Sequence, residues 1–170
     1  MMFFAGAQNM HREIERKFLV RNDGWRGKAE PVLFRQGYIA RTVDRTVRIR
    51  VAGNQGMITV KVKVGPISRH EFEYEIPLHD ANELLNSLAP VEIIEKYRYT
   101  FSECGHVWEI DEFLGANSGL VIAEVELQSE EEEVELPAWV GEEVSKISKY
   151  FNASLVQSPY GSWNHNEKQP

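Results

Sequence analysis

Charged side chains along this chain come in pairs of like charge, and the two members of each pair are two residues apart. The acidic pairs are Glu13 and Glu15, Glu71 and Glu73, Glu109 and Asp111, and Glu124 and Glu126; the basic pairs are Arg48 and Arg50, Lys61 and Lys63, and Lys96 and Arg98. Residues two apart in a β-strand share one face, where neighbours of like charge repel each other. Such pairs are unfavourable on a plain surface, so they indicate a role in binding a charged ligand.

Paired cations on one face predict a site for a polyanion, because guanidinium groups bind phosphate oxygens bidentately. Paired carboxylates on the same face would repel a phosphate unless a divalent metal neutralised them, and Mg²⁺ commonly bridges carboxylates to substrate phosphates. The five histidines lack the spacing of a metal motif such as HExxH, and the single cysteine, Cys104, excludes a cysteine-based zinc site. The pattern therefore predicts a phosphate site assisted by a metal that carboxylates hold.

The elements that carry these residues are predicted to be strands, because charged and apolar residues alternate with period two. Eight strands are expected, over residues 11–20, 32–40, 45–52, 57–64, 69–76, 91–101, 107–113 and 120–128. Turn residues at 53–56 and 103–106 predict hairpins, so we expect a mainly β fold with a largely antiparallel sheet. An open sheet with one solvated face would explain the alternation as well. If the eight strands close into a barrel, the charged face lines a tunnel.

Three helices are expected to flank these strands. The first follows the fifth strand, with Asp80 as its N-cap, Glu83 three residues later, and an apolar stripe that ends before Pro90. The second is expected to start at Ser129 and to present the acidic run 130–133 to solvent. A third is expected between residues 141 and 155. The predicted architecture is thus an α+β fold in which strands dominate.

The segment Glu13-Ile14-Glu15-Arg16-Lys17 resembles the ExExK signature of the CYTH superfamily, also called the triphosphate tunnel metalloenzymes. This signature is short, but further motifs follow in the order shown by small bacterial members of the family. They lie at residues 35–38, 47–50, 59–61, 95–99, 109–113, 123–126 and 139–144, with Arg69, Glu71 and Glu73 between the third and the fourth. The resemblance covers residues 11–155.

The resemblance implies an eight-stranded antiparallel tunnel that binds a triphosphate group and one or two Mg²⁺ or Mn²⁺ ions. It implies metal binding by Glu13, Glu15, Asp111, Glu124 and Glu126, and phosphate binding by Lys17, Arg48, Arg50, Lys61, Lys96 and Arg98. Tyr38 stands where relatives carry a tunnel tyrosine, although a core aromatic would explain it equally well. Glu71 and Glu73 are expected to orient the cations. Together with Tyr38 and Lys17 they are the candidate catalytic residues. Lys149, where bacterial relatives usually have an arginine, is a further candidate phosphate ligand.

The resemblance favours a metal-dependent hydrolase of triphosphate groups, specifically an inorganic tripolyphosphatase that releases phosphate and pyrophosphate. Tripolyphosphate is the expected substrate because few aromatic residues could contact an organic group in the tunnel. The apolar face of the strands carries Phe72, Tyr74, Tyr97 and Tyr99, which leaves only Tyr38 as an aromatic candidate for the tunnel. The alternatives are a class IV adenylate cyclase, a thiamine triphosphatase, and a non-catalytic module that binds polyphosphate or nucleotides. A purely structural barrel is disfavoured, since unpaired buried charges are costly.

The chain has 170 residues and a formal net charge of −7, which argues against a nucleic-acid-binding protein. Its longest apolar stretch, residues 1–7, is far shorter than a membrane span of roughly 20 residues and lacks the basic flank of a secretory signal. Residues 1–9 are predicted to be an N-terminal extension, and residues 10–170 a single domain. The single cysteine fits a reducing compartment, so we expect a cytoplasmic protein with a small-molecule partner and leave its oligomeric state open.

Overall fold

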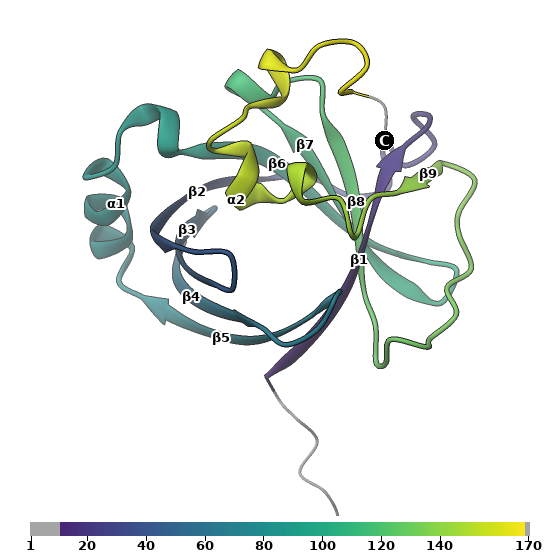
Figure 1. The fold of residues 1–170 in the computed structure, drawn as a ribbon, viewed down its shortest axis with the longest axis horizontal. Coiled ribbons are helices and arrows are strands. Elements are labelled where there is room, and N and C mark those ends of the chain that lie inside the picture. The colour runs from purple at the N-terminus through teal and green to yellow at the C-terminus, as the bar shows by residue number, and fades with distance from the viewer. Residues whose placement is uncertain (1–10, 169–170) are drawn as a thin grey trace, which may run out of the picture.

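An eight-stranded antiparallel barrel dominates the computed structural model, which describes residues 11–168 (Figure 1). Its strands are β1 (Arg12–Val20), β2 (Val32–Arg41), β3 (Arg45–Ala52), β4 (Gln55–Lys63), β5 (Ser68–Ile76), β6 (Ile94–Glu103), β7 (His106–Phe113) and β8 (Val121–Glu126). Their order around the ring is β5-β4-β3-β2-β6-β7-β8-β1, and a pairing of β5 with β1 closes it. The prediction of a mainly β, closed antiparallel barrel is therefore confirmed.

The N-terminal strand β1 closes the barrel by using both of its edges. One edge pairs with β8 from Glu15 to Leu19. The other edge is divided, because residues 12–14 pair with residues 68–70 of β5, and further along the strand Phe18 and Val20 pair with the short ninth strand β9 (Val140–Glu143). The ring thus closes on β5 through three residue pairs, and β9 continues the same edge.

Both predicted hairpins form. Gly53 in the β3–β4 turn has a φ of 56°, and the β6–β7 turn uses Cys104 and Gly105 at φ values of 51° and 77°. Left-handed backbone of this kind suits glycine, which has no side chain to clash. Strand β6 begins at Ile94 and not at residue 91 as predicted, because Pro90–Glu92 form a short 3-10 turn, η1. Proline at the start of such a turn lacks the N–H that a strand would need.

Three apolar clusters pack outside the barrel and at one of its ends. The largest includes Trp108 and Trp139 and covers the outer side of β1, β7 and β8. A second, which includes Trp163, holds the C-terminal segment against the end of β6, β7 and β8. In the third, Leu85 of the helix that follows β5 packs on Ile49 of β3. Because the largest cluster is buried on the outside, most of the inner face of the barrel is left for polar side chains.

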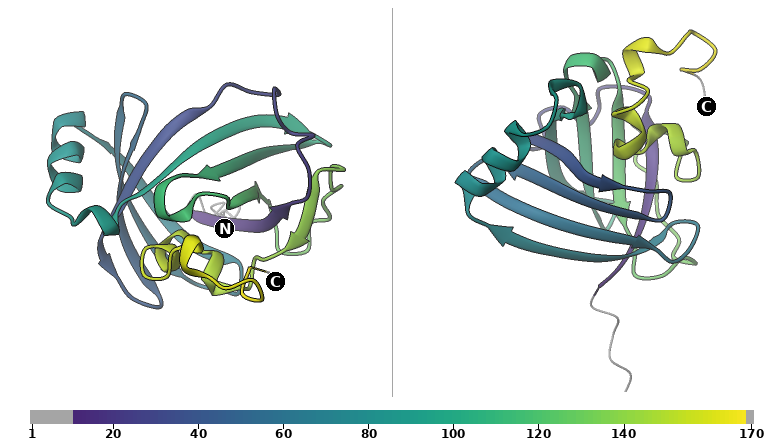
Figure 2. Two further views of the ribbon diagram at one scale, coloured as in Figure 1. Left: turned by 90° about the horizontal axis from the view of Figure 1, so that it is seen from above. Right: turned by 60° about the vertical axis from the view of Figure 1, so that its left-hand side comes forward.

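The helix after β5, α1, spans Leu78–Asn86, so the predicted N-cap at Asp80 is wrong. Pro77 takes the N-cap position, and Asp80 lies in the first turn, where a negative charge interacts favourably with the helix dipole. The predicted apolar stripe is present in part, since Ala81 and Leu85 are fully buried and Leu88 packs against the same cluster, whereas Leu84 is 37% exposed. Figure 2 shows α1 on the outside of the barrel, beside the strands β3 and β4 that it contacts.

The two helices predicted near the C-terminus do not form as expected. No helix starts at Ser129, and the acidic run is irregular chain in which Glu130 pairs with Arg12 and Glu132 with His106, both at 2.9 Å. Partners on distant strands favour this backbone, and helix periodicity carries no information about them. The segment predicted as a third helix instead holds β9 and two short helical turns, η3 (Ser148–Tyr150) and α2 (Asn152–Leu155).

Two further 3-10 turns complete the fold, η2 (Gly115–Asn117) and η4 (Tyr160–Ser162). Figure 1 shows α2 and the C-terminal segment at one end of the ring of strands. The N-terminal extension predicted for residues 1–9 lies outside the described residues. Within residues 11–168, no helix has both the length and the apolar character that crossing a membrane requires.

Candidate functional site: a charged tunnel

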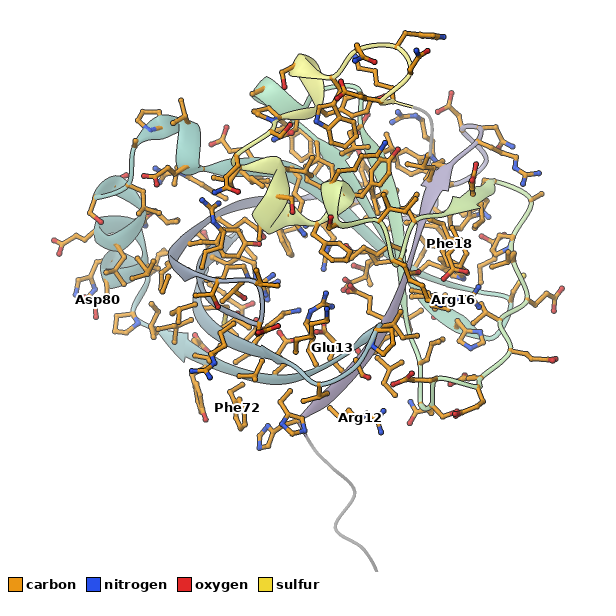
Figure 3. All side chains as sticks on the ribbon, in the orientation of Figure 1. Arg12, Glu13, Arg16, Phe18, Phe72 and Asp80 are labelled. Atoms are coloured by element: carbon orange, nitrogen blue, oxygen red, sulfur yellow. The ribbon has the colours of Figure 1, made fainter. Side chains whose placement is uncertain are left out.

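The charged side chains singled out from the sequence meet inside the barrel. Figure 3 shows Glu13 inside the ring of strands, whereas Phe72 points away from it and Arg16 and Phe18 lie on the other side of β1. Ion pairs connect inward side chains of β1 to those of β4 and β8, and inward side chains of β6 to those of β7 and β8. The charged face of the strands therefore lines the tunnel.

The tunnel lining consists of two groups of opposite charge. The group that we call the cation wall lies on β3, β4 and β6 and consists of Arg48, Arg50, Lys61, Lys96 and Arg98. The group that we call the acid wall lies on β7, β8 and β1 and consists of Glu109, Asp111, Glu124, Glu126, Glu13 and Glu15. Strand β5, which pairs with both β4 and β1, adds Glu71 and Glu73 between them. Each wall thus occupies one side of the ring.

On the cation wall, Glu73 holds both arginines of β3. Arg50 Nη2 donates to the two carboxylate oxygens of Glu73 at 2.8 and 2.9 Å, and Arg48 Nη2 donates to one of them at 3.3 Å. Thr59 Oγ1 donates to the same carboxylate at 2.6 Å. Burial alone would raise the pKa of Glu73, but the Thr59 hydrogen bond and the two arginines outweigh burial and lower it. Glu73 is therefore charged at neutral pH and sits where it orients both guanidinium groups.

Lys61 spans the seam between the two walls. Its ammonium group lies 2.7 Å from Glu13 and 3.1 Å from Glu71. The candidate orienting residue Glu71 thus holds the lysine, as Glu73 holds the arginines.

Arg98 joins the cation wall to the acid wall at the opposite side. Its Nε and Nη2 donate to Asp111 at 2.7 and 2.6 Å, Nη2 also donates to Glu124 at 2.8 Å, and Nη1 pairs with Glu109. Lys96 pairs with the same Asp111, and these two side chains are 1% and 0% exposed. Burial lowers the pKa of Lys96 to about 8 although Asp111 acts in the opposite direction, and Arg98 adds to the lowering. Asp111 is thus compensated by two cations, as a buried carboxylate requires.

Lys17 is surrounded by carboxylates of the acid wall. It forms ion pairs with Glu15 and Glu124. Burial alone would lower the pKa of Lys17, but Glu124 and Glu15 outweigh burial and raise it. Burial likewise opposes ionisation of Glu124, yet Lys17 and Arg98 hold the pKa of this carboxyl well below its ordinary value. Lys17 and Glu124 therefore both carry their charges at neutral pH.

The remaining carboxyls of the acid wall repel one another. Burial raises the pKa of Glu126, and Glu13, Glu15 and Glu109 raise it further. Burial also raises the pKa of Glu15, with Glu124 adding to the effect. The pKa of Glu109 is raised by burial as well. This wall therefore holds more negative charge than its lysine and arginine partners neutralise.

Such a set of oxygen donors fits a hard divalent cation, which would relieve the repulsion between them. Within the part of the chain that the structure describes, no three acidic, histidine or cysteine side chains already form a metal site. Lys17, Lys61 and Arg98 pair with carboxylates that such a site would use. A metal ion would therefore have to displace some of these ion pairs.

A cavity of about 800 Å³ opens at the end of the tunnel that α2 borders. On its inner side it reaches Tyr38 and the charged residues Glu15, Lys17, Arg48 and Lys61. Its outer lining, which we call the cationic mouth, consists of Arg41, Arg45, Lys63, Arg69 and Lys146 together with Asp44 and uncharged residues. A cluster of positive charges attracts anions from solution, so the cationic mouth favours entry of an anion although the net charge of the protein is −7.

Two of the candidate site residues differ in how they relate to the tunnel. Tyr38 borders the cavity, and burial raises the pKa of its phenol. Lys149 does not join the other candidates, because its ammonium contacts the backbone oxygen of Glu167 and lies 5.0 and 5.1 Å from the ring centres of Tyr150 and Trp163. The C-terminal segment therefore holds Lys149 apart from the two walls.

The sequence analysis missed two inward residues of β2, Phe34 and Gln36. The Phe34 ring centre lies 5.1 Å from the guanidinium carbons of both Arg50 and Arg98, so the expectation that Tyr38 is the only aromatic residue in the tunnel is wrong. Both missed residues lie on the same face of β2 as Tyr38. Assigning alternate residues of β2 to its two faces would have found them. The prediction that Tyr74 faces away from the tunnel is confirmed, since 59% of its surface is exposed.

Comparison with known proteins adds independent information about this site. A family model described as the CYTH domain matches residues 11–160. An inorganic triphosphatase of Acetivibrio thermocellus is 49% identical over 151 residues, which cover 89% of this chain and 97% of the relative. An inorganic triphosphatase of Nitrosomonas europaea is 36% identical over 150 residues, with 86% and 97% covered. A crystal structure of an inorganic triphosphatase matches with a TM-score of 0.63 and 33% identity, over 85% of this chain and 93% of the other.

Proposed function

This chain belongs to the CYTH domain family, and on that premise we propose that it hydrolyses inorganic tripolyphosphate to phosphate and pyrophosphate. The observation that carries the proposal is the convergence of the cation wall on a tunnel whose other side has an excess of carboxylates. The two relatives named inorganic triphosphatase support the same substrate class. We place the activity in the cytoplasm, where the free cysteine Cys104 would stay reduced.

The cation wall is suited to bind the phosphate chain. Lys61, Lys96 and Arg98 are paired with carboxylates of the acid wall, so an entering polyphosphate exchanges one set of anionic oxygens for another and leaves none of these cations unpaired. Glu73 keeps Arg48 and Arg50 in position from behind, which means that their charge is already oriented when the substrate arrives. Charges arranged in advance stabilise the negative charge that develops during phosphoryl transfer without reorganising at that moment.

The triphosphate tunnel metalloenzymes of this family depend on a metal ion, and the acid wall is where we place it. We propose that Glu13, Glu15, Asp111, Glu124 and Glu126 hold Mg²⁺ or Mn²⁺. When bound, such an ion polarises a phosphoryl oxygen and lowers the repulsion between substrate and wall. The acid wall itself then acts by holding these charges on the side of the tunnel opposite the cations, so that the phosphate chain lies between the two.

Selection of tripolyphosphate over nucleotides follows from what the tunnel offers to an organic group. A purine or thiamine ring would need a stacking surface or dedicated hydrogen bonds. The Phe34 ring is already in contact with the charged groups of Arg50, Arg98 and Lys96, at 5.1, 5.1 and 6.0 Å. It therefore helps to fix the cations and is not open to a base. Tripolyphosphate, by contrast, needs only phosphate-binding groups.

The experiment that tests this function is a substrate panel. Phosphate release is measured with tripolyphosphate, ATP and thiamine triphosphate, each with Mg²⁺, with Mn²⁺ and with excess chelator, and the ATP reactions are also assayed for cyclic AMP. We expect the highest kcat/KM with tripolyphosphate, little cyclic AMP, and no turnover in chelator. Equal or faster turnover of ATP or thiamine triphosphate would reassign the substrate. Tight binding without turnover of any compound would identify a non-catalytic module.

A further inference from the structure

Gln36 lies on the same face of β2 as Phe34 and Tyr38, within the motif at residues 35–38, although its neutral side chain adds nothing to the pattern of charges. On β2 it stands between Phe34 and Tyr38, which both face the tunnel. The register of the sheet places it opposite Arg50 on β3 and opposite Ile94 on β6. One neighbour is therefore a cation that Glu73 already holds, and the other is apolar and offers no hydrogen bond.

The Gln36 amide is buried without partners. The residue is 0% exposed, and within the described residues neither Nε2 nor Oε1 has a hydrogen-bond partner. Almost all buried side-chain amides in folded proteins are hydrogen-bonded, because an unpaired one loses its bonds to water and gains nothing in return. No group of the described chain satisfies the Gln36 amide, which points to a polar partner from outside the chain, such as a bound ligand.

The unpaired groups around Gln36 are mostly donors. The Nε–H groups of Arg48 and Arg50 are buried and unpartnered in the same way. Both arginines use Nη2 for their contacts with Glu73, so their Nε–H groups are not engaged in those contacts. Three orphaned donor groups on adjacent strands β2 and β3 fit a ligand that presents several acceptor oxygens, and a phosphate chain does so.

We propose that Gln36 is a phosphate-binding residue of the tunnel, whose Nε2 donates to a non-bridging oxygen of the substrate beside the Nε–H groups of Arg48 and Arg50. This inference rests on the proposed function for the identity of the phosphate compound. Lys61, Lys96 and Arg98 must give up carboxylate partners of the acid wall when they bind phosphate, whereas the Gln36 amide has no partner to give up. Its hydrogen bond therefore contributes to affinity without the loss of an existing one.

The test uses Gln36→Met, which keeps the length and volume of the side chain and removes both polar atoms. We expect KM for tripolyphosphate to rise about tenfold to a hundredfold, the size of one hydrogen bond to a charged group, with kcat little changed. We also expect a higher Tm for the ligand-free variant, since the unpaired amide is gone. A structural role for Gln36 predicts the reverse, a lower Tm and an unchanged KM.

A second variant, Gln36→Glu, separates donor from acceptor. It keeps an acceptor oxygen near Arg50 and lacks the donor, so we expect KM to rise at least as much as in Gln36→Met. Retention of the parental KM by Gln36→Glu, or by Gln36→Met, would overturn the proposal. The matched control is Gln55→Met at the exposed start of β4, for which we expect parental kinetics.

Direct binding keeps this inference distinguishable from the proposed function. Calorimetric titration with tripolyphosphate in chelator measures affinity without turnover, and we expect the same tenfold to hundredfold loss in Gln36→Met. If the parent protein binds tripolyphosphate and does not hydrolyse it, the proposed function fails while the loss of affinity still supports Gln36. If parent and variant bind equally, or if a water molecule alone satisfies the amide and the variant shows only a changed Tm, the inference fails.

Discussion

The cation wall and the acid wall differ in how completely their charges are compensated. On the cation wall, Glu73 and Thr59 form a fixed support behind Arg48 and Arg50, and this support lowers the pKa of Glu73. On the acid wall, burial and mutual repulsion instead raise the pKa of Glu126. One wall is thus organised before any ligand arrives, and the other is not.

This difference indicates that the acid wall lowers the stability of the fold. Groups that are paired in the fold stabilise it, whereas carboxylates that repel each other are tolerated only because a bound cation later compensates them. The structure therefore separates a preorganised phosphate-binding side from a metal-binding side that is completed by its ligand. Single substitutions in the two walls test this separation, because their expected effects differ in size and sign.

The largest effect is expected from Arg98, which connects the walls. Arg98→Met leaves Asp111, Glu109 and Glu124 without their shared guanidinium, and removal of one partner from a buried ion-pair network typically costs about 3–5 kcal/mol. Urea unfolding at pH 7 measures the loss. The control is Arg16→Met on the outer side of β1, where the arginine pairs with Glu143 at 2.5 Å. Similar losses in both variants would show that Arg98 does not join two walls.

A smaller effect, on catalysis, is expected from the preorganised wall. Arg50→Ala should lower kcat/KM for tripolyphosphate by the equivalent of about 2–4 kcal/mol, the scale for removing one charge-stabilising group from a prepared site. Phosphate release under steady-state conditions checks this, with Arg16→Ala as the variant expected to change little. A rate within a factor of two of the parent would place Arg50 outside the site.

The support behind the arginines gives a third prediction. Glu73→Gln should lower the free energy of unfolding by about 1–2 kcal/mol at pH 7, because charged hydrogen bonds to Arg48, Arg50 and Thr59 become weaker. The pKa of Glu73 is lowered in the fold, so its contribution is complete above the ordinary carboxyl pKa and is lost as pH falls through the folded value. The difference in Tm between parent and variant should therefore shrink in acid. A constant difference from pH 7 to pH 3 would contradict this assignment.

The smallest effect should have the opposite sign. Glu126→Gln is expected to raise Tm in chelator by no more than ~2 °C at pH 8, because it removes a repelling charge that solvent partly screens. The folded pKa of Glu126 is raised, so its charge costs stability above that value, and the cost is absent below the ordinary carboxyl pKa. Thermal unfolding at pH 8 and pH 4 checks the sign. The same variant should need more Mg²⁺ or Mn²⁺ for activity, and a lower Tm with an unchanged metal requirement would favour a structural role.

The barrel and most of its lining could be predicted because strand parity is a strong local signal. Residues such as Glu13 and Arg50 alternate with apolar neighbours that must face the other way, so one face of each strand is specified without knowledge of its partners. Closure was a further step, which the resemblance to the CYTH superfamily implied. Alternation alone favoured an open sheet with one solvated face.

The failures share a different cause. Asp80 fits an N-cap in isolation, but Pro77 sets the start of α1 earlier in the chain. Glu130 and Glu132 fit a helix face, but Arg12 and His106 hold them in irregular chain. The second outcome does not follow from local pattern, because the partners that decide it are distant in sequence. Gln36 escaped notice for the opposite reason, since a neutral residue contributes nothing to a pattern of charges.

The way in which β1 closes the barrel has a consequence for how the chain folds during synthesis. Strands β2 to β5 and β6 to β8 pair mainly with neighbours in sequence and can form as soon as they are made. Strand β1 is made first, yet its partners include residues 122–126 and 140–143. A strand that carries the ExExK motif and unpaired edges must therefore wait for most of the polypeptide to emerge from the ribosome. Translation order and assembly order are reversed in this barrel, and the segment richest in tunnel chemistry is the one expected to need protection from aggregation longest.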